Sequence, residues 1–306
     1  MTIQVFGHKA PDTDATGSPI IWAWYLSEVA GTPAEARLLG EPNTEAAFVL
    51  DRWNLPRPQI IADVDEGAPV VIVDTNNPDE LPPSVNQADI LEIIDHHKLT
   101  GGLQTKGPIN VTVRAVACTA TILHDLMGAE AERMPESIKG AMLSCILSDT
   151  LEFRSPTTTD ADKALAEKLA ADLGVSIPDY AAEMFAAKSD VSAFTDAELI
   201  RMDSKVGDFD GTKLRISVLE TTAPEIPLGR KDSLMRTMQD VAAEDGVDQV
   251  MLFIVDIIRE EATLLVPNER VKAIAEASFG QSVSGDTVVL PGVMSRKKQI
   301  IPNIKV

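Results

Sequence analysis

The sequence predicts an α/β protein with two domains: an N-terminal domain built on a mainly parallel sheet flanked by helices, and a smaller C-terminal α/β domain. The chain has 306 residues, which exceeds the size at which a single hydrophobic core usually stops growing. Its N-terminal part alternates short apolar runs of strand type with helical runs, an order typical of a parallel sheet covered on both faces. A second set of strand and helix patterns follows a short polar segment.

The elements of the N-terminal domain follow one another along the chain. Short apolar runs predict strands at residues 3–6, 70–74 and 90–95. Runs with a helical spacing of apolar residues predict helices at 14–29, 119–127, 135–148, 160–173 and 178–187. Pro135 stands at the start of its helix, where its missing N–H leaves no hydrogen bond unmade. We expect this domain to span residues 1–188.

The segment SDVSAF at residues 189–194 is short, polar and without apolar period, and it is predicted to be a hinge linker. The C-terminal domain is expected over residues 195–306. Its predicted strands lie at 214–219, 249–257 and 263–266, and its predicted helices at 231–244 and 269–278. These patterns are sufficient for a second, separate core.

The charge of the chain limits its partners. Lys and Arg number 27 and Asp and Glu number 47, which gives a formal charge of −20. Such a surface repels nucleic acid and anionic membranes, so neither is an expected partner. An enzyme of this charge that acts on phosphate compounds needs metal cations and a local basic cluster.

The cellular location is expected to be the cytoplasm. No apolar run approaches the length needed to span a bilayer, and the N-terminus lacks the pattern of a signal peptide. The two cysteines, Cys118 and Cys145, both stand in apolar surroundings and are predicted to be buried free thiols rather than a disulfide.

The first candidate site segment is GHKAPDTD at residues 7–14, which follows the first strand and opens a helix. Loops at the carboxyl ends of parallel strands are where open α/β sheets bind ligands. His8, Asp12 and Asp14 together suit a divalent cation. The alternative is an ordinary helix N-cap with an incidental histidine.

Two further strands end in polar residues. Asp74 ends an apolar strand, where a carboxylate is costly unless it is exposed, paired or bound to metal; the alternative is a turn-starting Asp. The third strand ends in Asp95-His96-His97. Adjacent side chains point in different directions, so we interpret one histidine as a ligand and the other as a proton donor. Asp95 is then expected to orient a ring.

Asp149 lies at the end of an apolar helix, where an anion opposes the helix dipole unless a cation lies beside it; a capped or solvated Asp is the alternative. The candidate set contains two imidazoles, four carboxylates and no thiolate, which favours Mn²⁺, Mg²⁺ or Co²⁺ over structural Zn²⁺. Six such ligands suit two ions about 3.5–4 Å apart with at least one shared carboxylate. Asp74 and Asp149 are the candidates for bridging.

The densest basic run is SRKKQ at residues 295–299, which could be a solvated tail. Its apolar flanks indicate an ordered segment instead, and Arg and Lys are the expected phosphate binders. Lys205, just after the linker, could join this cluster. His124 lies in an apolar helical stretch and is interpreted as structural or surface-exposed.

Several segments resemble the DHH phosphoesterase superfamily, and specifically the family II (manganese-dependent) inorganic pyrophosphatases. These segments are GHKAPDTDA (7–15), VDTN (73–76), DHH (95–97), RAVACTATIL (114–123), SDTLEFRSPTTTD (148–160) and SRKKQIIP (295–302). The DHH set indicates only the superfamily, whereas SRKKQ is more selective for the family.

The resemblance implies an N-terminal DHH domain that carries the metals and a C-terminal DHHA2-type domain that binds substrate. It implies that His8 and Asp12 bind one ion, that Asp14 and His96 bind the other, and that Asp74 and Asp149 contact both. His97 is implied to face the substrate, and phosphate to be held by Lys205, Arg296 and Lys297. Such enzymes are usually homodimers joined through the N-terminal domain.

The predicted function is hydrolysis of pyrophosphate to two phosphates by a water that two metal ions activate. We expect two Mn²⁺ per subunit, with Co²⁺ or Mg²⁺ possible, and a further Mg²⁺ that arrives with the substrate. His97 and Asp95 are the predicted catalytic residues, and Arg and Lys of the C-terminal domain form a phosphate clamp. Because the ligands precede residue 150 and the basic run lies near 296, the domains are expected to close on the substrate about the hinge.

Two alternatives stay open. The first is a related DHH phosphodiesterase that acts on short oligonucleotides or cyclic dinucleotides, although the charge of −20 and the SRKK segment favour pyrophosphate. The second is a metal-dependent phosphate-binding or scaffold protein without catalysis, which would need a damaged ligand set.

Overall fold

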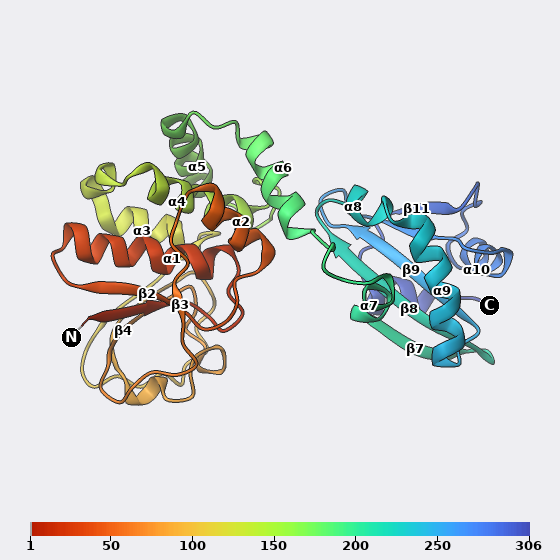
Figure 1. Ribbon diagram of the computed structural model, residues 1–306, viewed down its shortest axis with the longest axis horizontal. Coiled ribbons are helices and arrows are strands. Elements are labelled where there is room, and N and C mark those ends of the chain that lie inside the picture. Colours follow the sequence, from red (N-terminus) through yellow and green to blue (C-terminus); the bar gives the residue numbers. More distant parts are fainter. Residues whose placement is uncertain (1) are drawn as a thin grey trace. The chain divides into compact units, whose positions relative to one another are not determined.

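The computed structural model describes residues 2–306 and divides into two compact units, one that ends at Ala187 and one from Lys188 to Val306 (Figure 1). Each unit contains one β-sheet with helices, so the predicted α/β class is confirmed. No helix among the described residues is long and apolar enough to cross a membrane. The predicted hinge at residues 189–194 stays a prediction.

The first unit contains a six-stranded sheet in the order β3-β2-β1-β4-β5-β6, and every neighbouring pair is parallel. The strands are β1 (Ile3–Phe6), β2 (Ala34–Leu38), β3 (Gln59–Ile60), β4 (Pro69–Val73), β5 (Asp89–Asp95) and β6 (Asn110–Val113). The first strand of the chain is therefore central, and its neighbours β2 and β4 follow later in the sequence.

The helices of this unit share one large apolar core on one face of the sheet (Figure 1). They are α1 (Thr13–Trp24), α2 (Thr44–Arg52), α3 (Thr119–Met127), α4 (Glu136–Thr150), α5 (Asp160–Leu173) and α6 (Ile177–Lys188). A π-helical turn, Tyr25–Val29, extends α1, and a 3₁₀ turn, Gly128–Arg133, follows α3. The second face of the sheet carries a smaller apolar core that includes Leu81 and Val85, which belong to loops with short 3₁₀ turns.

The second unit contains a five-stranded mixed sheet in the order β11-β10-β9-β8-β7, in which only β8 and β9 are parallel. Its strands are β7 (Ser204–Phe209), β8 (Thr212–Thr221), β9 (Gln249–Asp256), β10 (Glu261–Leu265) and β11 (Thr287–Pro291). Its helices are α7 (Asp196–Met202), α8 (Glu225–Leu228), α9 (Lys231–Asp245) and α10 (Glu269–Phe279), and π- and 3₁₀-helical turns follow at Arg296–Ile300 and Ile301–Asn303. Two apolar cores pack on this sheet.

The residues expected to form the linker are held to the second unit by polar contacts. The Thr221 hydroxyl donates to Ser189 at 2.7 Å. The Arg230 guanidinium donates to the backbone carbonyls of Val191 and Phe194, both at 2.9 Å. The segment therefore has fixed polar partners, and Val191 also packs against an apolar core of the second unit.

Helices α1 and α4 approach closely because Gly17 of α1 has no side chain. A Cβ atom at this position would lie 2.3 Å from the Cys145 sulfur of α4. The Cys145 thiol in turn donates to the Thr13 carbonyl at 3.4 Å. Both cysteines are buried and free, as the sequence predicts. Glycine at residue 17 thus allows α1 and α4 to pack closely against each other.

We expect Gly17→Ala to lower the free energy of unfolding by about 1–3 kcal/mol, because the added methyl group overpacks this crossing. Adding Cys145→Ala should restore part of the loss, since the two sites share one contact. Urea denaturation of the metal-free chain measures both effects. Gly107→Ala is the control, because a Cβ there meets nothing within 4 Å. Additive losses in the double variant would contradict this account of the crossing.

Candidate metal centre

The loop after β1 is fixed by the start of α1. Asp12 is the N-cap of this helix, and its carboxylate accepts the backbone N–H of Ala15 at 3.0 Å. The cap turns the loop so that His8 Nε2 lies 3.7 Å from an Asp12 oxygen and 3.6 Å from an Asp74 oxygen. The N-cap role and the ligand role proposed for Asp12 are therefore compatible.

Asp74 lies at the centre of the cluster, directly after β4. It is 1% exposed, and its N–H donates to the Ile94 carbonyl at 2.9 Å. Its φ of 61° is in the left-handed region, which Asp tolerates better than most residues. His96 Nε2 lies 3.3 Å from one carboxylate oxygen, and the Thr119 hydroxyl donates to the same oxygen at 3.0 Å. This backbone conformation points the carboxylate at residues from three other segments.

Asp14 and Asp149 are the remaining carboxylates of the cluster. Asp14 is 1% exposed and accepts hydrogen bonds from the Ser18 hydroxyl and, at 2.7 Å, from the Thr119 N–H. The Oδ2 atom of Asp149 is buried and has no hydrogen-bond partner among the described residues. Helix α4 ends one residue after Asp149, and the next three residues all have positive φ.

Three groups of side chains have ligand atoms that lie within 4.8 Å of one another. The groups are His8 with Asp12 and Asp74, Asp14 with His96 and Asp149, and Asp74 with His96 and His97. The orphaned oxygen of Asp149 and this donor set fit divalent cations with a preference for oxygen and imidazole.

The electrostatics of the cluster support the same conclusion. Burial raises the pKa of Asp74 well above its ordinary value, and the carboxylates of Asp14, Asp12 and Asp149 raise it further. Burial and the charges of Asp14 and Asp12 act in the same direction on the pKa of Asp149. These carboxylates cannot all ionise together without a compensating positive charge.

His97 differs from His96 in its surroundings. Its side chain is 52% exposed, and its Nδ1 lies 2.9 Å from the buried carboxylate of Asp95. The same Asp95 oxygen accepts the N–H groups of His96 at 2.8 Å and His97 at 3.0 Å. This arrangement makes Nδ1 the protonated nitrogen and leaves Nε2 of His97 unbound by Asp95.

The pKa values of this pair move apart. The hydrogen bond to Asp95 raises the pKa of His97 above 6.5. Burial raises the pKa of Asp95, but hydrogen bonds from His97 and Asn76 outweigh it, and the net pKa is lowered. Asp95 thus holds the His97 ring in one orientation, and the role of His97 as a proton donor stays a prediction.

The predicted phosphate binders lie in the second unit. Arg296 and Lys297 begin a π-helical turn whose N-cap is Ser295, and Lys205 is an exposed residue of β7. Arg296 Nη1 lies 2.6 Å from the carboxylate of Asp203. The run at 295–299 is thus an ordered segment rather than a solvated tail.

Several polar residues around the cluster had no predicted role. Thr119 donates to both Asp14 and Asp74, and Asn76 donates to Asp95 and to the Lys98 carbonyl. Both residues lie within or beside segments that carry the family resemblance, but nothing in their spacing indicates these contacts. His124 is half-buried in α3, and burial lowers its pKa, which agrees with a structural role.

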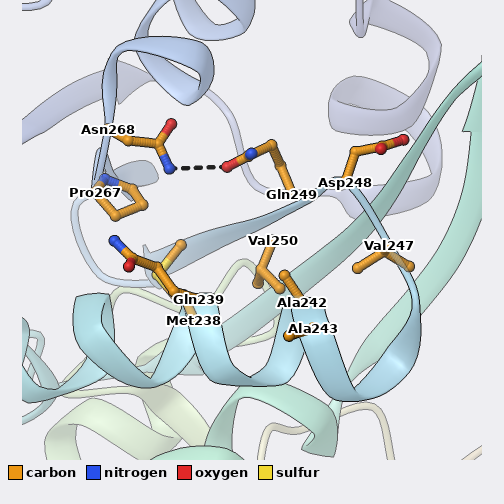
Figure 2. A pocket seen from close by; sticks show the side chains of 10 residues that line it. All are labelled: Met238, Gln239, Ala242, Ala243, Val247, Asp248, Gln249, Val250, Pro267 and Asn268. Carbon is orange, nitrogen blue, oxygen red and sulfur yellow. Dashed lines mark hydrogen bonds between the residues drawn. The ribbon is translucent and has the colours of Figure 1, made fainter.

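A cavity of about 510 Å³ lies elsewhere, in the second unit, between α9, the start of β9 and the residue that caps α10 (Figure 2). The Asn268 amide donates to Gln249 across it at 2.8 Å. Asp248 is its one ionisable lining residue. This cavity offers neither a metal-binding cluster nor a cation for phosphate.

Comparisons with known proteins match both units. The DHH family N-terminal domain matches residues 2–148, and the DHHA2 domain matches residues 182–306. A Deinococcus radiodurans protein, named a probable manganese-dependent inorganic pyrophosphatase, is 40% identical over 99% of this chain and 98% of its own length. The manganese-dependent inorganic pyrophosphatase of Methanocaldococcus jannaschii is 35% identical over 98% of this chain and 97% of its own length.

A solved structure is also similar. The crystal structure of a Methanococcus jannaschii protein assigned to the family II inorganic pyrophosphatases matches with a TM-score of 0.63 and 33% identity. The match covers 99% of this chain and 98% of the other.

The raised pKa of Asp149 predicts a pH effect on the metal-free chain. A carboxyl whose folded pKa lies above its ordinary 3.8 binds its proton more tightly when folded. The stabilisation from this bound proton is complete below pH 3.8. It is lost as the pH rises toward the pKa that Asp149 has in the folded protein. Compared with the wild type, metal-free Asp149→Asn should therefore become relatively more stable as the pH rises from about 5 to 8.

Thermal unfolding of both proteins across this pH range, after chelation, measures the difference. Adding Mn²⁺ should reverse the order, because the wild type then gains more from the ion than Asp149→Asn does. A stability difference that does not change with pH would contradict the raised pKa.

Proposed function

The chain belongs to the family II, manganese-dependent inorganic pyrophosphatases of the DHH superfamily, and from this premise we propose that it hydrolyses pyrophosphate to two phosphates. The observation that carries the proposal is the cluster of carboxylates and imidazoles in which Asp149 has an orphaned buried oxygen. The names of relatives that match nearly the whole chain support the same substrate.

We propose that the cluster holds two Mn²⁺ per subunit, with Co²⁺ or Mg²⁺ as possible replacements. His8 and Asp12 would bind one ion, Asp14 and His96 the other, and Asp74 and Asp149 would contact both; two of the three observed groups support this division. When bound, the ions supply a water of lowered pKa and positive charge against the phosphates.

His97 and Asp95 would supply the proton for the leaving phosphate. Asp95 holds the ring through Nδ1, so Nε2 is the atom that can donate to an oxygen of the leaving group. The raised pKa of His97 increases the share of protonated imidazole near neutral pH. Charge on Asp95 also stabilises the imidazolium before the proton is transferred.

Arg296, Lys297 and Lys205 would hold the phosphates, and a further Mg²⁺ would arrive with the substrate. The Nη1 atom of Arg296 lies 2.6 Å from an Asp203 carboxylate oxygen, as an ion pair without hydrogen-bond geometry. A guanidinium fixed at one corner can present its remaining donors to a phosphate as a fork. The closing of the domains about residues 189–194 belongs to this same proposal.

We also propose that the chain is a cytoplasmic homodimer joined through the first unit. The edge strand β6 supports a partner there, because an edge strand leaves backbone groups free to pair. Val111 on β6 is 52% exposed and Leu91 on the adjacent β5 is 37% exposed.

Phosphate release from pyrophosphate tests the function directly. After chelation, we expect Mn²⁺ or Co²⁺ to restore hydrolysis more fully than Zn²⁺ or Mg²⁺. Asp74→Ala should lose both the bound metal and the activity, because its carboxylate lies at the centre of the cluster. A dinucleotide is assayed in parallel, to test the alternative that the chain is a phosphodiesterase.

Cleavage of the dinucleotide without cleavage of pyrophosphate would instead identify a phosphodiesterase. Metal binding without turnover of either compound would support the non-catalytic alternative.

The two adjacent histidines should respond differently to the same change. His96→Gln should weaken Mn²⁺ binding, because Nε2 lies in the cluster. His97→Gln should keep the metal and lower kcat by about 10²–10⁴-fold, the usual contribution of a general acid. Isothermal titration with Mn²⁺ and steady-state kinetics separate the two effects. Equal losses of metal affinity in both variants would make His97 a ligand.

Arg296→Ala should raise KM and lower kcat for pyrophosphate while Mn²⁺ affinity stays unchanged, because the residue contacts substrate and not the ions. Arg201→Ala is a matched control in the same unit, since Arg201 also forms a surface ion pair with an aspartate, Asp245. Kinetics of both variants are compared at saturating Mn²⁺. Normal kinetics for Arg296→Ala would remove this residue from the phosphate clamp.

A further inference from the structure

Glu45 is a buried carboxylate beside the metal centre that is not among its proposed ligands. It lies in the first turn of α2 and is 0% exposed. One oxygen, Oε2, accepts the Thr13 hydroxyl at 2.8 Å and the Ser148 hydroxyl at 2.6 Å. A single atom of α2 therefore joins the first turn of α1 to the last turn of α4.

The two donors stand next to proposed ligands in the sequence. Thr13 lies between Asp12 and Asp14, and Ser148 directly precedes Asp149. We propose that Glu45 is a positioning residue that holds these two ligand-bearing segments together for divalent cations. This inference rests on the proposed function, since it assumes that the cluster binds metal.

The cost of burying a carboxylate at residue 45 supports a positioning role for Glu45. A fully buried carboxylate is costly, and this one contacts the two segments that carry Asp14 and Asp149. A buried apolar side chain would fill the same place without that cost. The position at a helix N-terminus offsets part of the cost, because backbone N–H groups favour an anion there.

The rest of this segment also contacts the ligand loop. The Asn43 N–H donates to the Pro11 carbonyl at 3.0 Å. A Cβ on Gly40 would lie 2.6 Å from the Lys9 carbonyl oxygen. Residues 40–45 therefore lie along the segment from Lys9 to Thr13. Glu45 extends that contact to α4 through Ser148.

The direct test replaces Glu45 with Gln and with Leu and titrates the intact, chelated chain with Mn²⁺. Both hydroxyls donate to one oxygen, so a glutamine carbonyl can keep both hydrogen bonds, whereas leucine keeps neither. We expect Glu45→Leu to weaken Mn²⁺ binding by about 10- to 100-fold, as loss of a residue that orients metal ligands usually does. Glu45→Gln should recover most of that affinity.

Equal losses in Glu45→Gln and Glu45→Leu would show that only the charge of residue 45 acts on the ions, and would overturn the positioning role. Unchanged Mn²⁺ affinity in both variants, with a lower melting temperature alone, would overturn it as well.

Two serines of α4 provide a matched pair in case Glu45→Leu does not fold. Ser148 and Ser144 are one turn apart and both are buried. Ser148 donates to Glu45 at 2.6 Å, whereas Ser144 donates to the Gly140 carbonyl at 2.6 Å. Ser148→Ala should weaken Mn²⁺ binding about tenfold, and Ser144→Ala should change only the melting temperature.

The same Mn²⁺ affinity in the two serine variants would contradict the inference. A wild-type chain that binds Mn²⁺ but leaves pyrophosphate intact would contradict the proposed activity and not the role of Glu45. A wild-type chain that binds no divalent cation would overturn both.

Discussion

Mutual repulsion among buried carboxylates is the constraint on which the first unit depends. Asp14 and Asp74 are each 1% exposed, and Asp149 holds an oxygen that no other described group satisfies. A protein that gathers anions in this way stores an unfavourable interaction, which only protons or cations relieve. The packing around the cluster must therefore hold the carboxylates in place against that repulsion. The α1–α4 crossing and the hydrogen bonds of Thr119 to Asp14 and Asp74 both contribute to this.

The parallel strands place most side chains of the cluster at one edge of the sheet. Strands β1, β4 and β5 are parallel neighbours, so their carboxyl ends lie together and their following residues converge. Asp149 does not follow a strand. It lies at the C-terminal end of α4, where the helix dipole disfavours an anion. Bound cations would offset both unfavourable features, because their positive charge would balance the repulsion among the carboxylates and the opposing helix dipole.

The sequence predicts most of this site because strand ends and helix ends are visible as changes from apolar to polar residues. It does not reveal Thr119, Ser148 or Glu45, because each looks like an ordinary polar residue near a helix end. Their roles arise only when α1, α2, α3 and α4 pack together. The short strands β3 and β6 carry too few residues for a period, and β2 includes two charged residues. The turn Asp210-Gly211, with φ of 48° and 86°, joins β7 and β8, and an Asp-Gly pair is a hairpin signal that the sequence does contain.

The order of the strands has a consequence for the chain during its synthesis. Because β1 is central and its neighbours follow it in the sequence, the first strand made must wait for both of them before it is paired on each side. The proposed ligand set extends from His8 to Asp149, so a nascent chain cannot complete it until α4 has left the ribosome and folded. The second unit, from Lys188 onward, contributes none of these six residues. If these six residues bind metal as proposed, the ions can be bound before the second unit has been translated.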